Sequence, residues 1–329
     1  MPGFLSHYIA GQAALQLVRE NVRNIILGSD KNNGMSGEKL YNLGTQGPDI
    51  FFYYMPGHLR KRSRGLGTEM HQGNIGKFFL HMANITRNAP ASQKDTIFAY
   101  TAGFIMHYAL DAQAHPYVYA RTHLDNVPKI KNSTVHRKFE TAIDVALLKL
   151  VSGKKPADYG QWELIRANPS QMLIAADATR IAVKNVYKRI LPLGVVYRAL
   201  QCTVWLTRLL QSRKGRRKRW MELVENLTIR ENLYSALIHD QQLSKAAEKE
   251  DCLNTKKAPW NAPWAEANEF SSDSFIERYH LAVQEGAQML DSLYSFAYED
   301  LDIENLKKVI GCRSLKTGKH SAPKPWKLL

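Results

Sequence analysis

The spacing of apolar residues along the chain predicts a succession of helices. Between residues 5 and 27, apolar side chains recur at intervals of three and four, which is the period of an amphipathic helix. Similar spacing, or a continuous apolar run, predicts further helices at 70–87, 95–121, 133–152, 177–191, 193–211, 220–240 and 274–298. No segment alternates apolar and polar residues between hairpin turns, as strands would. We therefore expect an all-α, multihelical fold.

The breaks in this pattern bear on domain organisation. Residues 44–67 carry Gly-Pro and Pro-Gly pairs and are typical of a loop. Residues 212–219 and 245–264 lack an apolar period, but apolar helices continue beyond both. We therefore expect one domain over residues 1–329. In this interpretation residues 1–152 supply the helices of a metal site, and residues 153–329 add packing helices with a basic insertion near 212–219.

Charge narrows the choice of partners. The 329 residues include 45 Lys and Arg against 30 Asp and Glu, a net charge of +15, which favours phosphate-bearing molecules, acidic lipid surfaces or nucleic acid. The three cysteines are far apart and odd in number, so a disulfide scaffold is excluded. The first residues lack the pattern of a signal peptide, and we expect a cytoplasmic location, with peripheral membrane attachment as an option.

One segment bears directly on that option. The apolar run 191–210 is followed by RKGRRKR at 213–219, which is typical of an interfacial anchor that binds anionic lipid. The alternative interpretation is a core helix followed by a solvated turn.

Histidines concentrate in the first half of the chain, where eight of the eleven precede residue 137. His107, Asp111 and His115 follow one another at four-residue intervals, so a helix would present all three on one face. His136 and Glu140 repeat the same interval. Imidazoles and carboxylates in this arrangement are ligands that zinc accepts.

Three further side chains extend this constellation: His71 at the start of a predicted helix, Asp49 on a Gly-Pro loop, and His7 near the start. On its own, a histidine four residues from a carboxylate on an apolar helix is more often a core residue with satisfied hydrogen bonds. Burying so many ionisable groups without a cation would be costly, so together they favour a site for several metal ions. The remaining histidines we interpret as non-ligands: His58, His81, His123, His239, His280 and His320.

The same motifs resemble those of the zinc-dependent phospholipase C family, which is related in fold to the single-strand-specific zinc nucleases. The resemblance rests on PGFLSHYIAG (2–11), QGPDIFFYY (46–54), GxxMH (67–71), AYTAGFIMHYALDAQAHPY (99–117) and HRKFETAID (136–144). It covers about the first 150 residues and is looser beyond them, where NAPW (261–264) and the helix from Ser274 carry it.

The resemblance implies a ligand set for each ion. His71, His107 and Asp111 would hold one zinc, with Asp49 adjoining it. A second zinc would be held by His115, His136 and Glu140. A third would lie between the bridging Asp111, His7 and an amino terminus exposed by processing. We therefore expect two zinc ions and leave a third open.

The expected activity is hydrolysis of a phosphodiester by a metal-activated water, with phospholipase C-type cleavage of phospholipid headgroups as the leading hypothesis. Asp49 is the candidate general base or water-orienting group. Phe51, Phe52 and Tyr53 are candidates for substrate binding, although alternate members could simply fill the core. Two alternatives stay open: a zinc nuclease or small-molecule phosphodiesterase, and a non-catalytic, metal-stabilised helical scaffold.

Overall fold

The computed structural model describes residues 3–28, 36–53, 63, 65–123, 129–156, 160–210, 216–228, 238, 250–266 and 268–320. Within these ranges the regular structure is helical, and the extended pairings are isolated bridges, Trp260 with Ser271 and Arg313 with His320. The prediction of an all-α fold is confirmed. Within the same ranges, no helix combines the length and apolar composition that a membrane span requires.

The first half of the chain forms α1 (Phe4–Leu17), α2 (Glu20–Leu27), α3 (Glu38–Gly44), the 3-10 turn η1 (Gly47–Asp49), α4 (Ile50–Tyr53), α6 (Leu66–Gln72), α7 (Ile75–Asn88), α8 (Ala91–Thr122) and α9 (Lys129–Ser152). The second half forms α10 (Gln161–Leu164), α11 (Pro169–Tyr187), α12 (Leu193–Leu210), α13 (Arg216–Thr228), α15 (Phe275–Tyr298) and α16 (Ile303–Ile310).

Two predicted helices are each divided in two. The segment 5–27 breaks at Val18 and Arg19, whose backbones are extended. Arg19 donates its backbone N–H to the Asp291 carboxylate of α15 at 3.0 Å, so a distant contact ends the helix. The segment 70–87 breaks at Gly73–Asn74, where Asn74 has a positive φ of 60°. Conversely, the expected loop at 44–67 contains short helical turns.

The predicted helix 220–240 corresponds in its first part to α13, which ends at Thr228. Residues 229–237, 239 and 240 lie outside the described part of the chain, as do residues 211–215 of the basic insertion.

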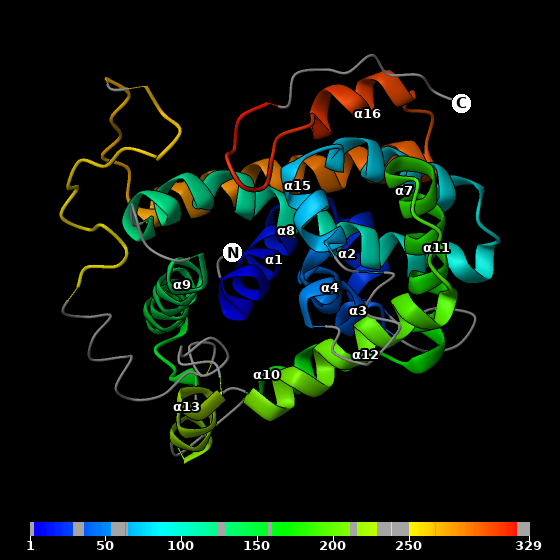
Figure 1. Ribbon diagram of the computed structural model, residues 1–329. Helices are drawn as coiled ribbons and strands as arrows, with labels where there is room; N and C mark the ends of the chain where they lie inside the picture. The colour runs from blue at the N-terminus through cyan, green and yellow to red at the C-terminus, as the bar shows by residue number, and fades with distance from the viewer. Residues whose placement is uncertain are drawn as a thin grey trace.

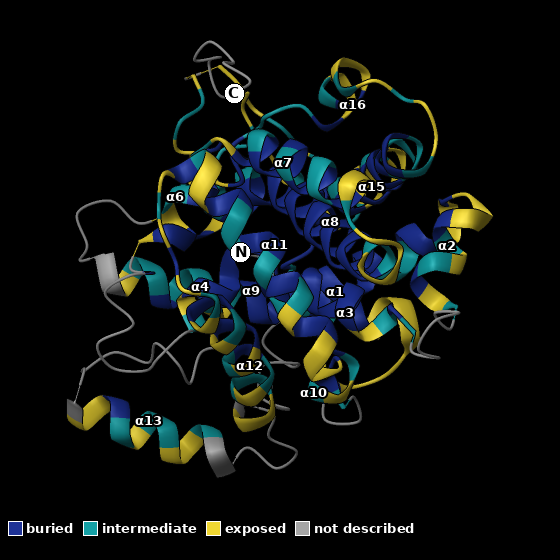
Figure 2. Cartoon of the chain, turned by 90° about the vertical axis from the view of Figure 1, so that its right-hand side faces the viewer, coloured by how far each residue is buried: buried dark blue, intermediate teal, exposed yellow. Residues whose placement is uncertain are grey.

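Helix α8 forms the centre of the molecule. It packs along α15 and also contacts α1, α3, α7, α9 and α11 (Figure 1). Nearly all of its middle section is buried, as the dark blue of α8 shows in Figure 2. A side chain on α8 is therefore surrounded by protein on several sides, and the ionisable groups of this helix must find partners inside the fold.

Two glycines allow α3 to approach α8 closely. A Cβ atom on Gly103 of α8 would overlap the Tyr41 carbonyl oxygen of α3, and one on Gly44 would overlap the Tyr100 carbonyl oxygen. The contact brings the turn that follows α3 against His107. Gly47 in that turn has a positive φ of 51°, and a Cβ atom there would overlap the His107 ring.

The chain returns to α8 after the long helix α15. Ser274 and Glu277 form a capping box at the start of α15, which fixes where this helix begins. After α16, the Tyr108 hydroxyl of α8 donates to the Ile310 carbonyl at 3.1 Å and accepts from the Arg313 N–H at 3.0 Å. Residues 311–320 thereby lie beside the part of α8 that carries the ionisable residues.

Candidate metal centre and substrate pocket

All eight side chains proposed as metal ligands converge on one region. They come from α1 (His7), η1 (Asp49), α6 (His71), α8 (His107, Asp111, His115) and α9 (His136, Glu140). Their ligand atoms form three groups in which the atoms lie within 4.8 Å of one another: His7–His107–Asp111, Asp49–His71–His107 and His115–His136–Glu140. We call the five residues of the first two groups the inner cluster and the three residues of the last group the outer cluster.

Asp111 lies at the centre of the inner cluster. Its Oδ1 is 3.3 Å from His7 Nε2, and its Oδ2 is 3.0 Å from His107 Nε2 and 3.5 Å from His71 Nε2. Asp49 Oδ1 lies 3.4 Å from His71 Nε2 and 3.9 Å from His107 Nε2. The two oxygens of Asp111 therefore face different histidines, as a bridging carboxylate would.

The outer cluster lies one turn further along α8. Glu140 Oε1 is 2.8 Å from His136 Nε2 and 3.8 Å from His115 Nε2. The ring of Tyr119 packs against both histidines, with centroid distances of 5.6 Å to His115 and 4.7 Å to His136. The aromatic ring limits the orientations that the two imidazoles can adopt.

Hydrogen bonds from Nδ1 fix the direction in which four of the imidazoles point. His107 Nδ1 is 3.0 Å from the Thr45 carbonyl, His71 Nδ1 is 2.6 Å from the Gly67 carbonyl, and His115 Nδ1 contacts the Leu315 carbonyl. Because a carbonyl only accepts, the ring nitrogen must be the donor.

The Nδ1 of His136 is also a hydrogen-bond donor, in this case to a hydroxyl. Thr122 Oγ1 donates to the Val118 carbonyl at 2.8 Å, so it accepts from His136 Nδ1 at 3.1 Å. In each neutral ring Nε2 is then left with its lone pair directed into a cluster, which is how metal-binding histidines are usually oriented.

The polar atoms of the clusters fit metal ions. Within the described residues, several buried atoms have no hydrogen-bond partner: both ring nitrogens of His7, Nε2 of His71, His107 and His115, Oδ1 of Asp49, and both carboxylate oxygens of Asp111. Buried atoms of this kind are rare and costly unless an ion satisfies them. The lone pairs of these atoms converge at distances at which a metal ion could be coordinated between them. Imidazole together with carboxylate is a donor set that suits zinc.

The pKa values agree with this chemistry. Burial lowers the pKa of His115 and of His136 well below its ordinary value, which keeps both rings neutral and able to bind metal. Burial also disfavours the charge of His71, but the facing carboxylates of Asp111 and Asp49, at 3.5 and 3.4 Å from its Nε2, outweigh it and raise the pKa of His71 to about 9. Burial likewise disfavours ionised Asp111, yet the histidines around it hold the pKa of that carboxyl well below its usual range. The inner cluster therefore attracts positive charge.

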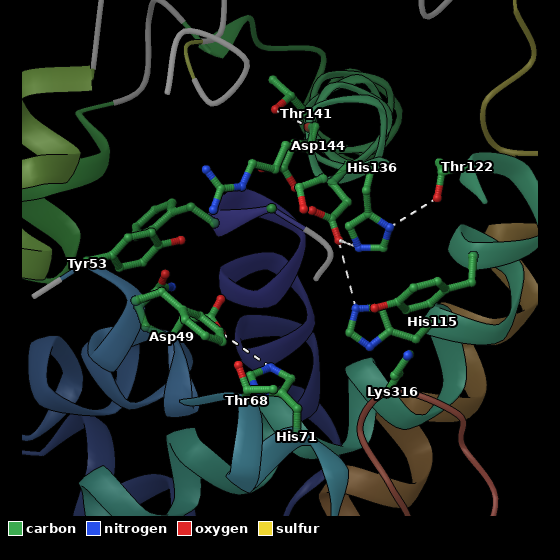
Figure 3. A pocket seen from close by; sticks show the side chains of 18 of the residues that line it. Asp49, Tyr53, Thr68, His71, His115, Thr122, His136, Thr141, Asp144 and Lys316 are labelled. Carbon is green, nitrogen blue, oxygen red and sulfur yellow. Dashed lines mark hydrogen bonds and ion pairs between the residues drawn. The ribbon is translucent and has the colours of Figure 1, made fainter. Parts of the chain in front are cut away.

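A pocket of about 590 Å³ opens over the two clusters (Figure 3). Its wall includes Asp49, His71, His115, His136 and Glu140. His7, His107 and Asp111 lie beneath this wall, buried to at least 98%. A substrate in the pocket would thus meet the outer cluster and the exposed edge of the inner one.

The three aromatic residues considered for substrate binding, Phe51, Phe52 and Tyr53, divide between pocket and core. Phe52 and Tyr53 line the pocket, and Phe52 packs against His71 with a centroid distance of 5.5 Å. Phe51 belongs to the hydrophobic core instead, as the alternative interpretation of this residue expects. Burial, with Asp49 nearby, raises the pKa of Tyr53, so its hydroxyl keeps its proton and can donate a hydrogen bond.

Lys316 is a pocket residue that the sequence patterns did not reveal. Its ammonium group lies 5.4 Å from the centroid of the Tyr119 ring, and Figure 3 shows it beside His115 on the side toward His71. The backbone N–H of Lys316 and the Ser314 hydroxyl both donate to the His71 carbonyl, at 3.3 and 3.1 Å. No local motif marks this lysine, because a chain segment some 200 residues after His115 brings it to the site.

Asp144 is the last residue of the motif HRKFETAID and lies outside the ligand groups. It accepts hydrogen bonds from the N–H groups of Leu5 and Ser6, at 3.0 and 2.8 Å, and from the Ser6 hydroxyl at 2.6 Å. A carboxylate at a helix N-terminus stabilises both the free N–H groups and the helix dipole. Asp144 of α9 thus anchors the start of α1, the helix that carries His7.

Where they are described, the histidines interpreted as non-ligands join none of the ligand groups. His81, His280 and His320 belong to none of the three ligand groups, and His123 lines the pocket without joining a group. His58 and His239 lie outside the described residues.

The fold and the site together define an all-α protein with a candidate centre for several metal ions beneath a substrate-sized pocket. The family model for zinc-dependent phospholipase C matches residues 6–190, more than half of the chain. The chain therefore belongs to the zinc-dependent phospholipase C family, whose members are hydrolases that depend on zinc. No curated protein and no solved structure matches the chain significantly.

Proposed function

We propose that this protein is a zinc-dependent hydrolase that cleaves the headgroup phosphodiester of a phospholipid. One observation carries the proposal: eight histidine and carboxylate side chains from five helical elements converge under a pocket, and four of the imidazoles are held by Nδ1 with Nε2 directed inward. The family supports both zinc and the phospholipid class of substrate.

We assign one zinc to each cluster. In the outer cluster the ligands are His115, His136 and Glu140. In the inner cluster, Nδ1 of His107 already binds the Thr45 carbonyl, so its Nε2 can serve only one ion. That nitrogen is closer to Asp111 than to Asp49, which favours an inner ion held by His71, His107 and Asp111, with Asp49 adjoining.

His7 and Oδ1 of Asp111 then remain as a partial third set. Two ligands are fewer than a stable zinc site uses, so a third ion would need a donor in addition to these two.

When bound, zinc supplies Lewis acidity, which offsets the charge that develops on a phosphoryl group under attack and favours the deprotonation of water. We assign Asp49 the role of orienting that water and receiving its proton, because its carboxylate lines the pocket while its Oδ1 faces His71 and His107. Pro48 restricts the backbone that presents it.

Lys316 adds positive charge on the other side of the pocket. Its ammonium group is solvent-exposed over Tyr119, and within the described residues it forms no ion pair. A phosphate lying across the two clusters would be within reach of this charge. We assign Lys316 the role of binding a non-bridging phosphoryl oxygen, while Tyr53 donates a hydrogen bond from the opposite wall.

Metal analysis combined with a turnover screen tests the proposal. Purified protein should contain at least two zinc ions and hydrolyse a phospholipid such as phosphatidylcholine, phosphatidylglycerol or phosphatidylinositol faster than single-stranded DNA. His136→Ala should lose one zinc and lower the melting temperature, because metal binding is coupled to folding.

Other outcomes of these measurements would contradict the ligand assignment or the proposed activity. Full metal content in His136→Ala would contradict the ligand assignment. Faster turnover of DNA would make the protein a zinc nuclease, and zinc without turnover of any phosphodiester would make it a scaffold.

A further inference from the structure

Helix α13 exposes a row of large apolar side chains to solvent. Trp220, Leu223 and Leu227 are 64%, 59% and 77% exposed. Their spacing of three and four residues places them on one side of the helix. The helix lies at the edge of the molecule in both views, and exposed yellow residues recur along it in Figure 2. An apolar row of this kind marks a surface that contacts a partner.

The charges around the row are segregated. Six of the seven residues at 213–219 are Lys or Arg, and none is acidic. Arg219, next to Trp220, is exposed. The acidic residues of α13 are Glu222 and Glu225, which follow Trp220 and Leu223 by two residues and so lie about 200° around the helix from them. Glu225 is buried and Glu222 is half-buried. An apolar row that is bordered by cations, with acid directed away, complements an anionic bilayer surface.

The helix that precedes α13 in the chain, α12, also exposes large apolar side chains. At the end of α12, Trp205 and Leu209 are one turn apart and are 59% and 37% exposed. Leu206, about 60° around the helix from Leu209, lines the pocket, as does Thr207 on the far side of the same turn. The apolar residues of α12 therefore border the pocket in which a lipid headgroup would bind.

We propose that Trp205 and Leu209 of α12, with Trp220, Leu223 and Leu227 of α13, form a docking surface for an anionic lipid bilayer. The surface would hold the pocket against the headgroup layer, so that a lipid can enter without leaving the bilayer completely. The biological meaning of this inference rests on the proposed phospholipid substrate, but binding to a bilayer can be measured without catalysis.

Vesicle binding by the full chain is the direct test. The protein should sediment with vesicles of phosphatidylcholine and phosphatidylserine more than with vesicles of phosphatidylcholine alone, and added salt should weaken the binding. The triple variant Trp220→Ser, Leu223→Ser, Leu227→Ser should bind at least about tenfold more weakly, because each side chain contributes apolar area. Arg219→Glu should weaken binding about fivefold for each unit of charge changed.

A matched control comes from exposed apolar residues elsewhere on the molecule. Ile190 and Phe270 are 78% and 67% exposed and lie outside the docking surface, so Ile190→Ser with Phe270→Ser should bind vesicles like the wild type. If the triple variant fails to fold, as judged by its melting curve, Arg219→Glu provides the same test through charge alone.

Activity separates this inference from the proposed function. The triple variant should hydrolyse a short-chain, monomeric phospholipid at the wild-type rate and a vesicle substrate at least about tenfold more slowly. Undiminished vesicle binding by the triple variant would overturn the docking surface, as would a wild type that binds both kinds of vesicle equally or neither. A wild type that binds anionic vesicles but hydrolyses no phosphodiester would instead contradict the proposed function alone.

Discussion

The two clusters differ in how the fold assembles them. The outer cluster uses two helices, α8 and α9, and its His136 and Glu140 are one helical turn apart. The inner cluster gathers His7, Asp49 and His71 from three separate elements around two residues of α8. Its central carboxylate, Asp111, is completely buried, whereas the His136 side chain of the outer cluster keeps 15% of its surface exposed.

This difference in assembly predicts that the two clusters differ in how well they tolerate substitution. A change in the inner cluster acts on packing between α1, η1, α6 and α8 as well as on metal binding, because its ligands are also buried residues. A change in the outer cluster acts mainly at the pocket wall. We therefore expect variants of the inner cluster to have the larger effects, and loss of the outer ion to leave the inner one bound.

Asp111→Asn should have the largest effect. The amide keeps the size of the carboxylate but removes the charge that three histidines share, so inner zinc should be lost and turnover should fall by more than about a thousandfold. Zinc content and turnover of the purified variant give the answer. Retention of all zinc with near-normal turnover would show that Asp111 is not a ligand of the inner zinc.

Asp49→Asn should leave the fold and the outer zinc intact while it lowers turnover by about 10²–10⁴-fold, as expected when a general base is removed. Zinc analysis tells the two roles of this residue apart. Weaker inner zinc would make Asp49 a ligand as well, and wild-type turnover in a fully metallated variant would exclude it as the base.

Thr122→Val tests the orientation of the outer cluster without removing a ligand. Valine matches threonine in shape but cannot accept from His136 Nδ1, so outer zinc affinity should fall by about 10–100-fold while inner zinc is retained. Competition with a chelator measures the affinity.

Thr86→Val is the matched control, because the buried Thr86 makes the same hydroxyl-to-carbonyl bond within α7, to Met82, and lies away from the site. Equal zinc affinity in the two variants would show that Thr122 has no positioning role.

Lys316→Met should have the smallest effect of the four. Loss of one charged hydrogen bond to the phosphate should lower kcat/KM by about tenfold, with zinc content unchanged and partial recovery in Lys316→Arg. Lys319→Met is the control, because Lys319 lies on the same loop but faces Glu269, at 3.6 Å, outside the pocket. The same loss in both variants would indicate a general effect of charge.

The fold class and the list of candidate ligands could be predicted from the sequence, whereas their grouping could not. Intervals of four residues placed His107, Asp111 and His115 on one face of α8, and the structure brings the other five candidates to that face. The single-domain interpretation stays a prediction. Phe51 shows the limit of such patterns, since adjacent aromatic residues after Asp49 do not reveal which of them face the pocket.

The sequence by itself determined what depends on neighbouring residues: the helices, their apolar faces and the pairs one turn apart, because helical geometry repeats over a few residues. Only the tertiary structure decided that α1 and α2 separate at Arg19, that Asp144 anchors the start of α1, and that Lys316 reaches the pocket. Each of these depends on contacts between segments more than 130 residues apart in the chain. No local period records such contacts, because they are selected by the packing of the complete core.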